Sequence, residues 1–99
     1  MEVQKGDLVQ SQNGRDKGKA LFVADTDDDY LILVDGKSRR LEQPKRKKRK
    51  HCLFLARDSS RVAEKLKTGE RVTNSEIRRA LAAWNAGAEE QADEEIGGG

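Results

Sequence analysis

The sequence predicts a mainly β protein with C-terminal helices: a small five-stranded barrel, then two short α-helices, then a disordered acidic tail. Three observations support this fold class. Short apolar runs separated by turn residues fill the first 57 residues, helical spacing and capping residues begin near Asp58, and the end of the chain is acidic with almost nothing to bury. We therefore divide the chain into a barrel with a basic extension (1–57), a helical part (58–86) and a tail (87–99).

The predicted strands span residues 8–11, 19–26, 30–34, 39–42 and 51–55. Three consecutive aspartates, Asp27 to Asp29, supply a polar turn of hairpin length between the second and third strands. Asp35-Gly36 follows the third strand, and glycine accepts the positive φ of a tight turn. Pro44 interrupts the chain after the fourth strand. Five short strands at close spacing favour closure into a barrel, which also removes exposed edges. Every residue from 30 to 34 is apolar, so two strand phases remain possible there.

Residues 58–60 (Asp-Ser-Ser) are candidates for the N-cap of a first helix, because their side-chain oxygens can accept unpaired backbone N–H groups. Val62 and Leu66 are four residues apart and share one helix face. Gly69 is a natural C-terminal stop. These signals predict a short helix between residues 60 and 69.

A second helix is predicted after Thr73, because Thr73 and Glu76 have the spacing of a capping box. An apolar stripe follows at positions i, i+4 and i+7, made by Ile77, Leu81 and Trp84. Residues 85–87 (Asn-Ala-Gly) are expected to end this helix. The tail from 87 to 99 is expected to be disordered, since it has few residues to bury.

Composition excludes several classes of protein. Only 34% of residues are hydrophobic, 38% are charged, and the mean hydropathy is -0.92. No apolar run approaches a membrane span, and the first residues lack the apolar region of a secretory signal. One cysteine, Cys52, and one histidine, His51, make an internal disulfide impossible and a structural zinc site unexpected. We expect a soluble, cytoplasmic, monomeric protein with no cofactor, no metal and no small-molecule substrate. It lacks paired catalytic groups, so we expect no enzymatic activity.

Charge is segregated along the chain. Residues 37–57 hold ten Lys or Arg against one acid, a net charge of +9, and residues 85–99 hold five acids and no base. Six consecutive bases, Lys45 to Lys50, favour a polyanionic partner over a merely solvated loop. The acidic tail would either fold back on the basic segment and compete with that partner or simply keep the protein soluble. Asp25–Asp29 are expected to form a turn rather than a cation site.

A glycine loop lies between the first two predicted strands. Gly14 and Gly18 allow a tight loop, from which Arg15, Lys17 and Lys19 project as cations. A nucleotide phosphate loop would require a further Gly-Lys-Ser/Thr opening a helix, whereas a strand follows here.

This stretch resembles the KOW motif, a glycine-centred loop and strand of ribosomal proteins and transcription elongation factors. The resemblance continues through residues 33–37 (Leu-Val-Asp-Gly-Lys) and the basic run ending in Lys50-His51. It looks most like the eukaryotic-type large-subunit ribosomal protein numbered fourteen, and like compact bacterial relatives of it. It covers roughly residues 4–57, and residues 58–84 match the family less closely. One departure is Leu21, where many KOW motifs carry another glycine.

The resemblance implies a small five-stranded SH3-like (KOW) barrel that docks on folded RNA, and it implies which residues take part. The motif glycines are Gly14, Gly18 and Gly36. The RNA-binding positions are Arg15, Lys17, Lys19, Lys37, Arg39, Arg40, Lys45, Arg46, Lys47, Lys48, Arg49, Lys50 and His51. For His51 and Cys52, packing roles are also expected.

Binding would use phosphates more than bases. The four aromatic residues are Phe22, Tyr30, Phe54 and Trp84, and none is interleaved with Lys45–Lys50 in the sequence. We therefore predict core or packing roles for them, no stacking platform, and recognition of RNA shape and backbone. Two alternatives remain. One is a protein-interaction barrel whose basic run is a nuclear import address. The other is a transcription-elongation KOW module, although we expect no room before the barrel for the polymerase-binding domain that usually precedes it in such factors.

Overall fold

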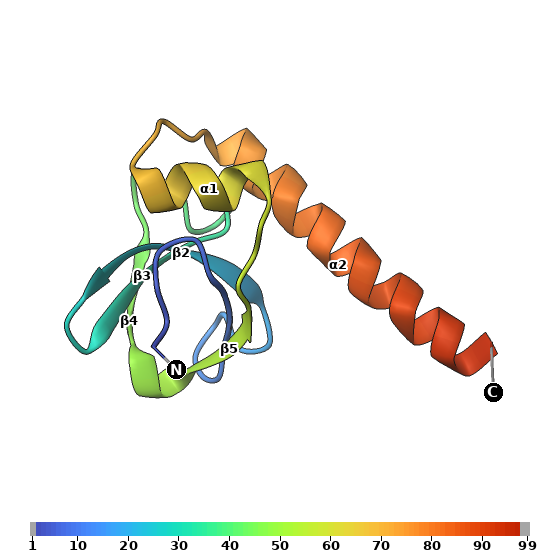
Figure 1. The fold of residues 1–99 in the computed structure, drawn as a ribbon. Coiled ribbons are helices and arrows are strands. Elements are labelled where there is room, and N and C mark those ends of the chain that lie inside the picture. The colour runs from blue at the N-terminus through green and yellow to red at the C-terminus, as the bar shows by residue number, and fades with distance from the viewer. Residues whose placement is uncertain (1, 98–99) are drawn as a thin grey trace.

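A five-stranded antiparallel sheet forms the body of the molecule (Figure 1). The computed structural model describes residues 2–97, with side chains for residues 2–87. The strands are β1 (Leu8–Ser11), β2 (Ala20–Asp27), β3 (Tyr30–Val34), β4 (Lys45–Lys48) and β5 (Cys52–Ala56), and a short 3-10 helix, η1 (Arg49–His51), joins the last two. The order across the sheet is β4-β3-β2-β1-β5. The mainly β class with C-terminal helices is confirmed.

The fourth strand is not where the sequence pattern predicted it. Residues 39–42 form a turn with a single bridge between Arg40 and Gln43, and β4 lies inside the basic run instead. The Asp35 carboxylate accepts the backbone N–H groups of Lys37 (2.8 Å) and Arg39 (2.7 Å), and so holds this segment in a turn. Alternation along β4 buries Lys47 and leaves Arg46 and Lys48 exposed, which separates like charges on the two faces of the strand.

The sheet curls but is not closed by strand pairing. Its register shifts at Ala24, between β2 and β3, and at Leu55, between β1 and β5. Such bulges bend a strand and increase its twist. Within residues 2–97, β4 and β5 are the two edges of the sheet, so the predicted barrel is present only as an open, curled sheet.

Each face of the sheet has its own hydrophobic cluster. The cluster inside the curl contains Val9, Leu21, Val23, Leu31 and Leu33. The other cluster contains Leu8, Phe22 and Val34 from the strands and Val62, Ala63, Leu66, Ile77 and Leu81 from the helices. The strand phase that the sequence left open is therefore settled: Leu31 and Leu33 point inward, and Tyr30 and Ile32 are the half-buried outer residues of β3.

The helix α1 (Arg61–Thr68) has the ends that the sequence predicted. The Ser60 hydroxyl accepts the Ala63 N–H at 3.2 Å, and Gly69 ends the helix with a positive φ of 78°. Val62 and Leu66 are buried against the sheet. The helix therefore covers one end of the curled sheet, as Figure 1 shows.

The helix α2 (Asn74–Gly97) begins as predicted but does not end as predicted. Thr73 Oγ1 accepts the Glu76 N–H at 3.2 Å, and Ile77 and Leu81 are buried. The helix continues through Gly87 to Gly97, beyond the end predicted at residues 85–87, while the disorder predicted for the tail stays a prediction.

Strong helix formers explain the extension of α2. Alanine, glutamate and glutamine dominate residues 82–95, and a single glycine inside such a run costs only about 1 kcal/mol relative to alanine. The helix leads away from the sheet (Figure 1). The acidic side chains after Gly87, and with them the question of whether the tail masks the basic segment, lie outside the described residues.

Candidate functional site

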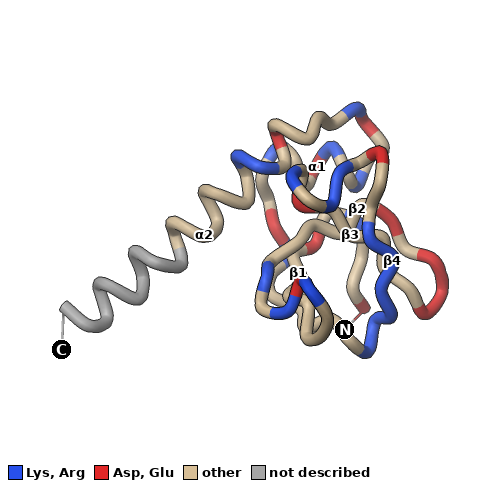
Figure 2. The backbone as a smooth tube through the Cα atoms, turned by 180° about the vertical axis from the view of Figure 1, so that it is seen from behind, with Lys and Arg blue, Asp and Glu red and all other residues tan. Residues whose placement is uncertain are grey.

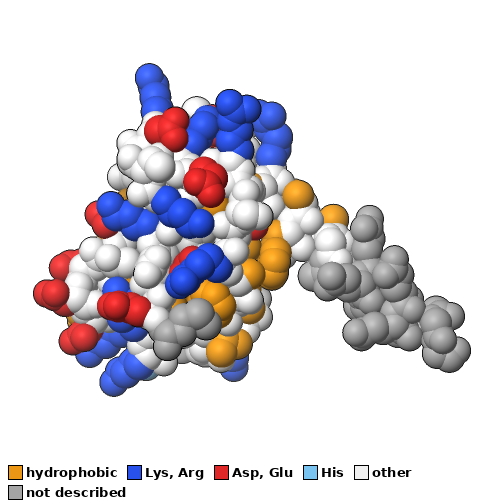
Figure 3. Space-filling view, in the orientation of Figure 1, with side chains coloured by type: hydrophobic (Ala, Val, Ile, Leu, Met, Phe, Trp, Pro, Cys, Tyr) orange, Lys and Arg blue, Asp and Glu red, His pale blue; other side chains and the backbone are white. Residues whose placement is uncertain are grey.

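Basic and acidic segments lie side by side on the sheet. Figure 2 shows the basic β4 next to the β2–β3 hairpin, whose tip is acidic. In Figure 3 acidic side chains gather at the end of this hairpin. Asp27 and Asp28-Asp29 form the tip, and Asp28 has a positive φ of 51°, so the predicted turn is present. Within the described residues, no group of three or more His, Cys, Asp or Glu side chains is placed to hold a metal ion.

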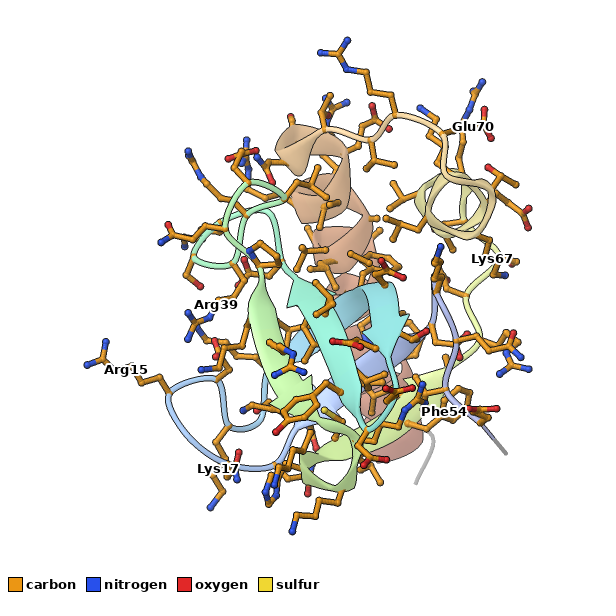
Figure 4. The ribbon with its side chains drawn as sticks, turned by 90° about the vertical axis from the view of Figure 1, so that its left-hand side faces the viewer. Arg15, Lys17, Arg39, Phe54, Lys67 and Glu70 are labelled. Atoms are coloured by element: carbon orange, nitrogen blue, oxygen red, sulfur yellow. The ribbon has the colours of Figure 1, made fainter. Side chains whose placement is uncertain are left out.

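The glycine loop between β1 and β2 is compact and internally bonded. Gly14 and Gly18 have positive φ values of 75° and 84°, as the motif requires. The Gly18 N–H donates to the Ser11 carbonyl at 2.8 Å, and the Lys17 N–H donates to the Gly14 carbonyl at 3.2 Å. This folding leaves Arg15 and Lys17 pointing away from the body of the molecule (Figure 4).

One side chain of this loop points inward and fixes its position. Asp16 is only 3% exposed, and its Oδ2 accepts hydrogen bonds from Arg39 Nε (3.1 Å) and Nη2 (2.9 Å). Arg39, a predicted RNA-binding residue, thus clamps the β3–β4 connection to the glycine loop. Its guanidinium is engaged by a carboxylate, which leaves it a structural role.

Lys47 also has a structural role that sequence reasoning missed. Its side chain is 7% exposed, and its ammonium donates to Ser11 Oγ and to the Asn13 carbonyl (2.8 Å for the latter). It therefore joins β4 to β1 and to the start of the glycine loop. The alternation of strand side chains was the signal that could have identified it, had β4 been placed within the basic run.

Arg49 ties together three separate segments. Its Nε donates to the Asp28 carbonyl at 2.7 Å and its Nη1 to the Val3 carbonyl at 3.0 Å. Arg46 pairs with Asp27 at 3.2 Å, and both side chains are more than half exposed. The backbone carbonyl of the half-buried His51 accepts the Gln12 N–H at 2.9 Å. The basic run is therefore a folded part of the sheet rather than a free linear segment.

The remaining predicted cations have no ion pair and no side-chain hydrogen bond among the described residues. We call them the cationic surface; its members are Arg15, Lys17, Lys19, Lys37, Arg40, Lys45, Lys48 and Lys50. All are exposed except Lys45, which is half-buried. They come from the glycine loop, the β3–β4 connection, β4 and η1.

Four of these cations line two hollows beside the glycine loop. One of about 380 Å³ is lined by Gly14, Arg15 and Lys45, together with the structural pair Asp16–Arg39. Another, of about 640 Å³, lies where the glycine loop meets α2 and is lined by Lys19, Lys37 and Arg78. Both hollows include glycine-loop residues, so Arg15, Lys19, Lys37 and Lys45 lie around this loop.

Arg78 is a basic residue at this surface that the sequence analysis did not select. Its Nη1 donates to the Gly36 carbonyl at 2.6 Å, and the Leu41 N–H donates to Asn74 Oδ1 at 2.9 Å. A Cβ atom at Gly36 would collide with the Asn74 carbonyl, so this glycine permits close approach of α2 to the loop. The start of α2 therefore positions the connection that carries Lys37 and Arg40.

Asp35 stabilises the same connection from within. Burial alone would raise the pKa of its carboxyl, but the hydrogen bonds from the Lys37 and Arg39 N–H groups outweigh it and lower the pKa. The Ser38 hydroxyl donates a further hydrogen bond at 2.9 Å. Asp35 is therefore an anionic centre around which the Lys37-bearing turn is built.

The aromatic residues do not all have the core roles that were predicted. Phe22 is fully buried, and Trp84 packs against the cluster beneath the helices. Tyr30 instead lies half-buried on the outer side of β3, directly across from Lys48. The Arg46 guanidinium carbon is 3.6 Å from the centre of its ring. No aromatic residue is interleaved with the basic run in the sequence, but the pairing of β3 with β4 brings Tyr30 next to it.

No protein-family model matches the chain, and no curated protein matches its sequence. Among the helices in the described part of the chain, none has both the length and the apolar character needed to cross a membrane.

Proposed function

We propose that this protein is a non-catalytic RNA-binding module of the KOW type, which docks on structured RNA such as ribosomal RNA through backbone phosphates. The observation that carries the proposal is the cationic surface: basic side chains from four separate segments, none with an ion pair among the described residues, four of which line the two hollows beside the glycine loop. Positive charge that the fold itself does not neutralise favours a polyanionic partner.

The fold supports the same proposal. We propose that the curled sheet is an SH3-like barrel of the KOW family, with its gap between β4 and β5 bridged by η1. The two glycines of the motif shape the loop, and Asp16 anchors it, so that Arg15 and Lys17 are held outward. Cations held in place by the fold lose less conformational entropy on binding than cations on a free loop.

Phosphate binding would release condensed counterions from the RNA. For about six phosphates neutralised, the logarithm of the affinity falls with the logarithm of the salt concentration at a slope of roughly -4 to -5. Binding of the full chain to ribosomal RNA fragments over a salt series measures this slope. A flat salt response, or no binding at low salt, would exclude the proposal.

A charge-matched pair of variants tests where the RNA binds. Replacing Arg15 and Lys17 with Gln should reduce the magnitude of the slope by roughly 1.4 to 1.8, since each phosphate contact contributes about 0.7 to 0.9. Replacing Arg61 and Arg71, two exposed arginines outside the cationic surface, removes the same charge and should leave the slope nearly unchanged. Equal losses in both variants would mean non-specific attraction without a defined face.

The nuclear import alternative fits the structure less well. Residues 45–48 pair with β3 as a strand, Lys47 is buried, and Arg49 is bound to backbone carbonyls. A receptor that reads a linear basic peptide would have to separate β4 from the sheet first.

A further inference from the structure

We propose that the outer side of β3 and β4 binds one unpaired RNA base, stacked against Tyr30. The inference rests on the RNA binding proposed above and adds to it a preference for loops, bulges or single strands over continuous duplex. It departs from the expectation of pure backbone recognition, because the fold brings Tyr30 next to the basic strand.

Tyr30 is available for such a role because the core does not use it. Neither hydrophobic cluster includes its ring, whereas the adjacent Leu31 is fully buried inside the curl. Its direct cross-strand neighbour is Lys48, whose ammonium is 6.0 Å from the ring centre. An aromatic surface flanked by cations is the combination that single-stranded RNA sites use.

Arg46 stacks on the Tyr30 ring but does not line the hollow beside it. Its guanidinium lies 3.6 Å from the ring centre and is also paired with Asp27, at 3.2 Å. Beside the ring is a hollow of about 400 Å³, lined by Asp29, Tyr30, Lys48, Arg49 and Lys50 but not by Arg46. In this proposal the base occupies the hollow while the Arg46–Tyr30 stack remains in place.

The charges around the hollow fit a nucleotide better than an isolated phosphate. Lys48 and Lys50 are exposed and have no ion pair among the described residues, so they can bind the phosphates on either side of the base. Asp29 also lines the hollow, and a carboxylate repels phosphate but can accept a hydrogen bond from an exocyclic amino group. A base inside a duplex is already stacked on both sides, so only an unpaired base can use the site.

Two RNA probes with equal numbers of phosphates test the inference: a stem–loop and a continuous duplex. Tyr30→Leu removes the ring and should weaken stem–loop binding roughly tenfold or more, given the usual contribution of one stacked base. Its binding to the duplex should change less than about twofold, because the phosphate contacts remain. Tyr30→Phe keeps the ring and serves as the matched control, with wild-type affinity expected for both probes.

Photocrosslinking of the unaltered protein gives an answer that does not depend on a variant folding. A stem–loop with bromouridine at the loop positions should crosslink to Tyr30, as mapped by mass spectrometry. Crosslinks that map only elsewhere, or equal losses of Tyr30→Leu on both probes, would overturn the stacking site. If the wild type bound neither probe, the proposed RNA-binding function itself would fail; steep salt-dependent binding with no effect of Tyr30→Leu would overturn only the stacking site.

Discussion

Two neighbouring lysines of β4 have opposite roles, although the sequence gives them identical side chains. Lys47 is buried and bonded to Ser11 and Asn13, while Lys48 is exposed and has no ion pair in the described part of the chain. Alternation in a strand is the cause, since successive residues face opposite sides of the sheet. A basic run read as one unit therefore overestimates the number of residues available to RNA.

We expect Lys47→Met to destabilise the fold by about 1 to 3 kcal/mol, because it leaves the Asn13 carbonyl and the Ser11 hydroxyl without their donor. Lys48→Met should change the free energy of unfolding by less than about 0.5 kcal/mol, as is usual for exposed positions, while weakening RNA binding. Urea denaturation of both variants and RNA titration of Lys48→Met measure these effects. Equal stability of the two variants would contradict the structural assignment of Lys47.

The Asp35 carboxylate makes stability depend on pH. The pKa of Asp35 in the folded protein lies below its ordinary value of 3.8, so the stability it contributes is present at neutral pH. This contribution is lost as the pH falls below 3.8 and through the lowered pKa of the folded state.

Replacing Asp35 with Asn should therefore cost stability at neutral pH, by about 1 kcal/mol for weakened hydrogen bonds to the turn. The gap between the wild type and Asp35→Asn should narrow as the pH is lowered through this range, because the wild-type carboxyl becomes protonated there. Thermal unfolding at a series of pH values tests this expectation. A gap that stayed constant into strong acid would show that the charge of Asp35 has no part in the stabilisation.

At the scale of elements, local sequence signals correctly predicted the helix ends that are set by one or two capping residues. The Ser60 cap, the Gly69 stop and the Thr73–Glu76 pair all lie where helix ends were predicted. The position of β4 could not be predicted in this way, because it depends on pairing with β3 and on a salt bridge between Asp16 and Arg39, which are far apart in sequence. The end of α2 was missed because one glycine was given more weight than the surrounding helix formers.

The candidate site was predictable in composition but not in arrangement. Motif matching selected Arg15 and Lys17, which are exposed, and equally Arg39 and Lys47, which serve the fold. Which cations remain for RNA depends on where each side chain finds a partner in three dimensions. Tyr30 was missed for the same reason, since its neighbours come from β4.

The contact between α2 and the β3–β4 connection can be tested at Gly36. Its φ is 77°, and an added Cβ would collide with the Asn74 backbone carbonyl. Gly18 is a matched control, because its φ is 84° but no atom lies within 4 Å of its Cβ position. Gly18→Ala should cost only the backbone strain of about 1 to 2 kcal/mol.

Gly36→Ala should cost clearly more than Gly18→Ala, since the strain is joined by displacement of the start of α2. Differences in the midpoint of urea denaturation provide the comparison. If the two variants were equally stable, the close approach of α2 to the loop would not contribute to stability.

At the scale of the whole molecule, the helices contribute residues to the hydrophobic core and are not an addition to a sheet that is already stable. Leu8, Phe22 and Val34 are fully buried on the face of the sheet that α1 and α2 cover. Without the helices these side chains would be exposed to water, at a cost of roughly 1.5 to 3 kcal/mol for each large apolar side chain. A small domain has too little stability to absorb a loss of this size.

We therefore expect a fragment of residues 1–57 not to fold by itself, although it contains all five described strands and the whole cationic surface. A fragment of residues 1–87 retains all the helix residues in the core, including Leu81, and should fold with a melting temperature close to that of the full chain. Amide dispersion in two-dimensional NMR spectra and cooperative thermal unfolding distinguish the two fragments. A cooperatively folded 1–57 fragment would show that the cluster inside the curl, which contains Val9, Leu21 and Leu33, is sufficient for the fold. If the 1–57 fragment bound RNA without folding cooperatively, the charge of the basic run would be sufficient for binding. The arrangement of cations that the helices help to hold would then not be required.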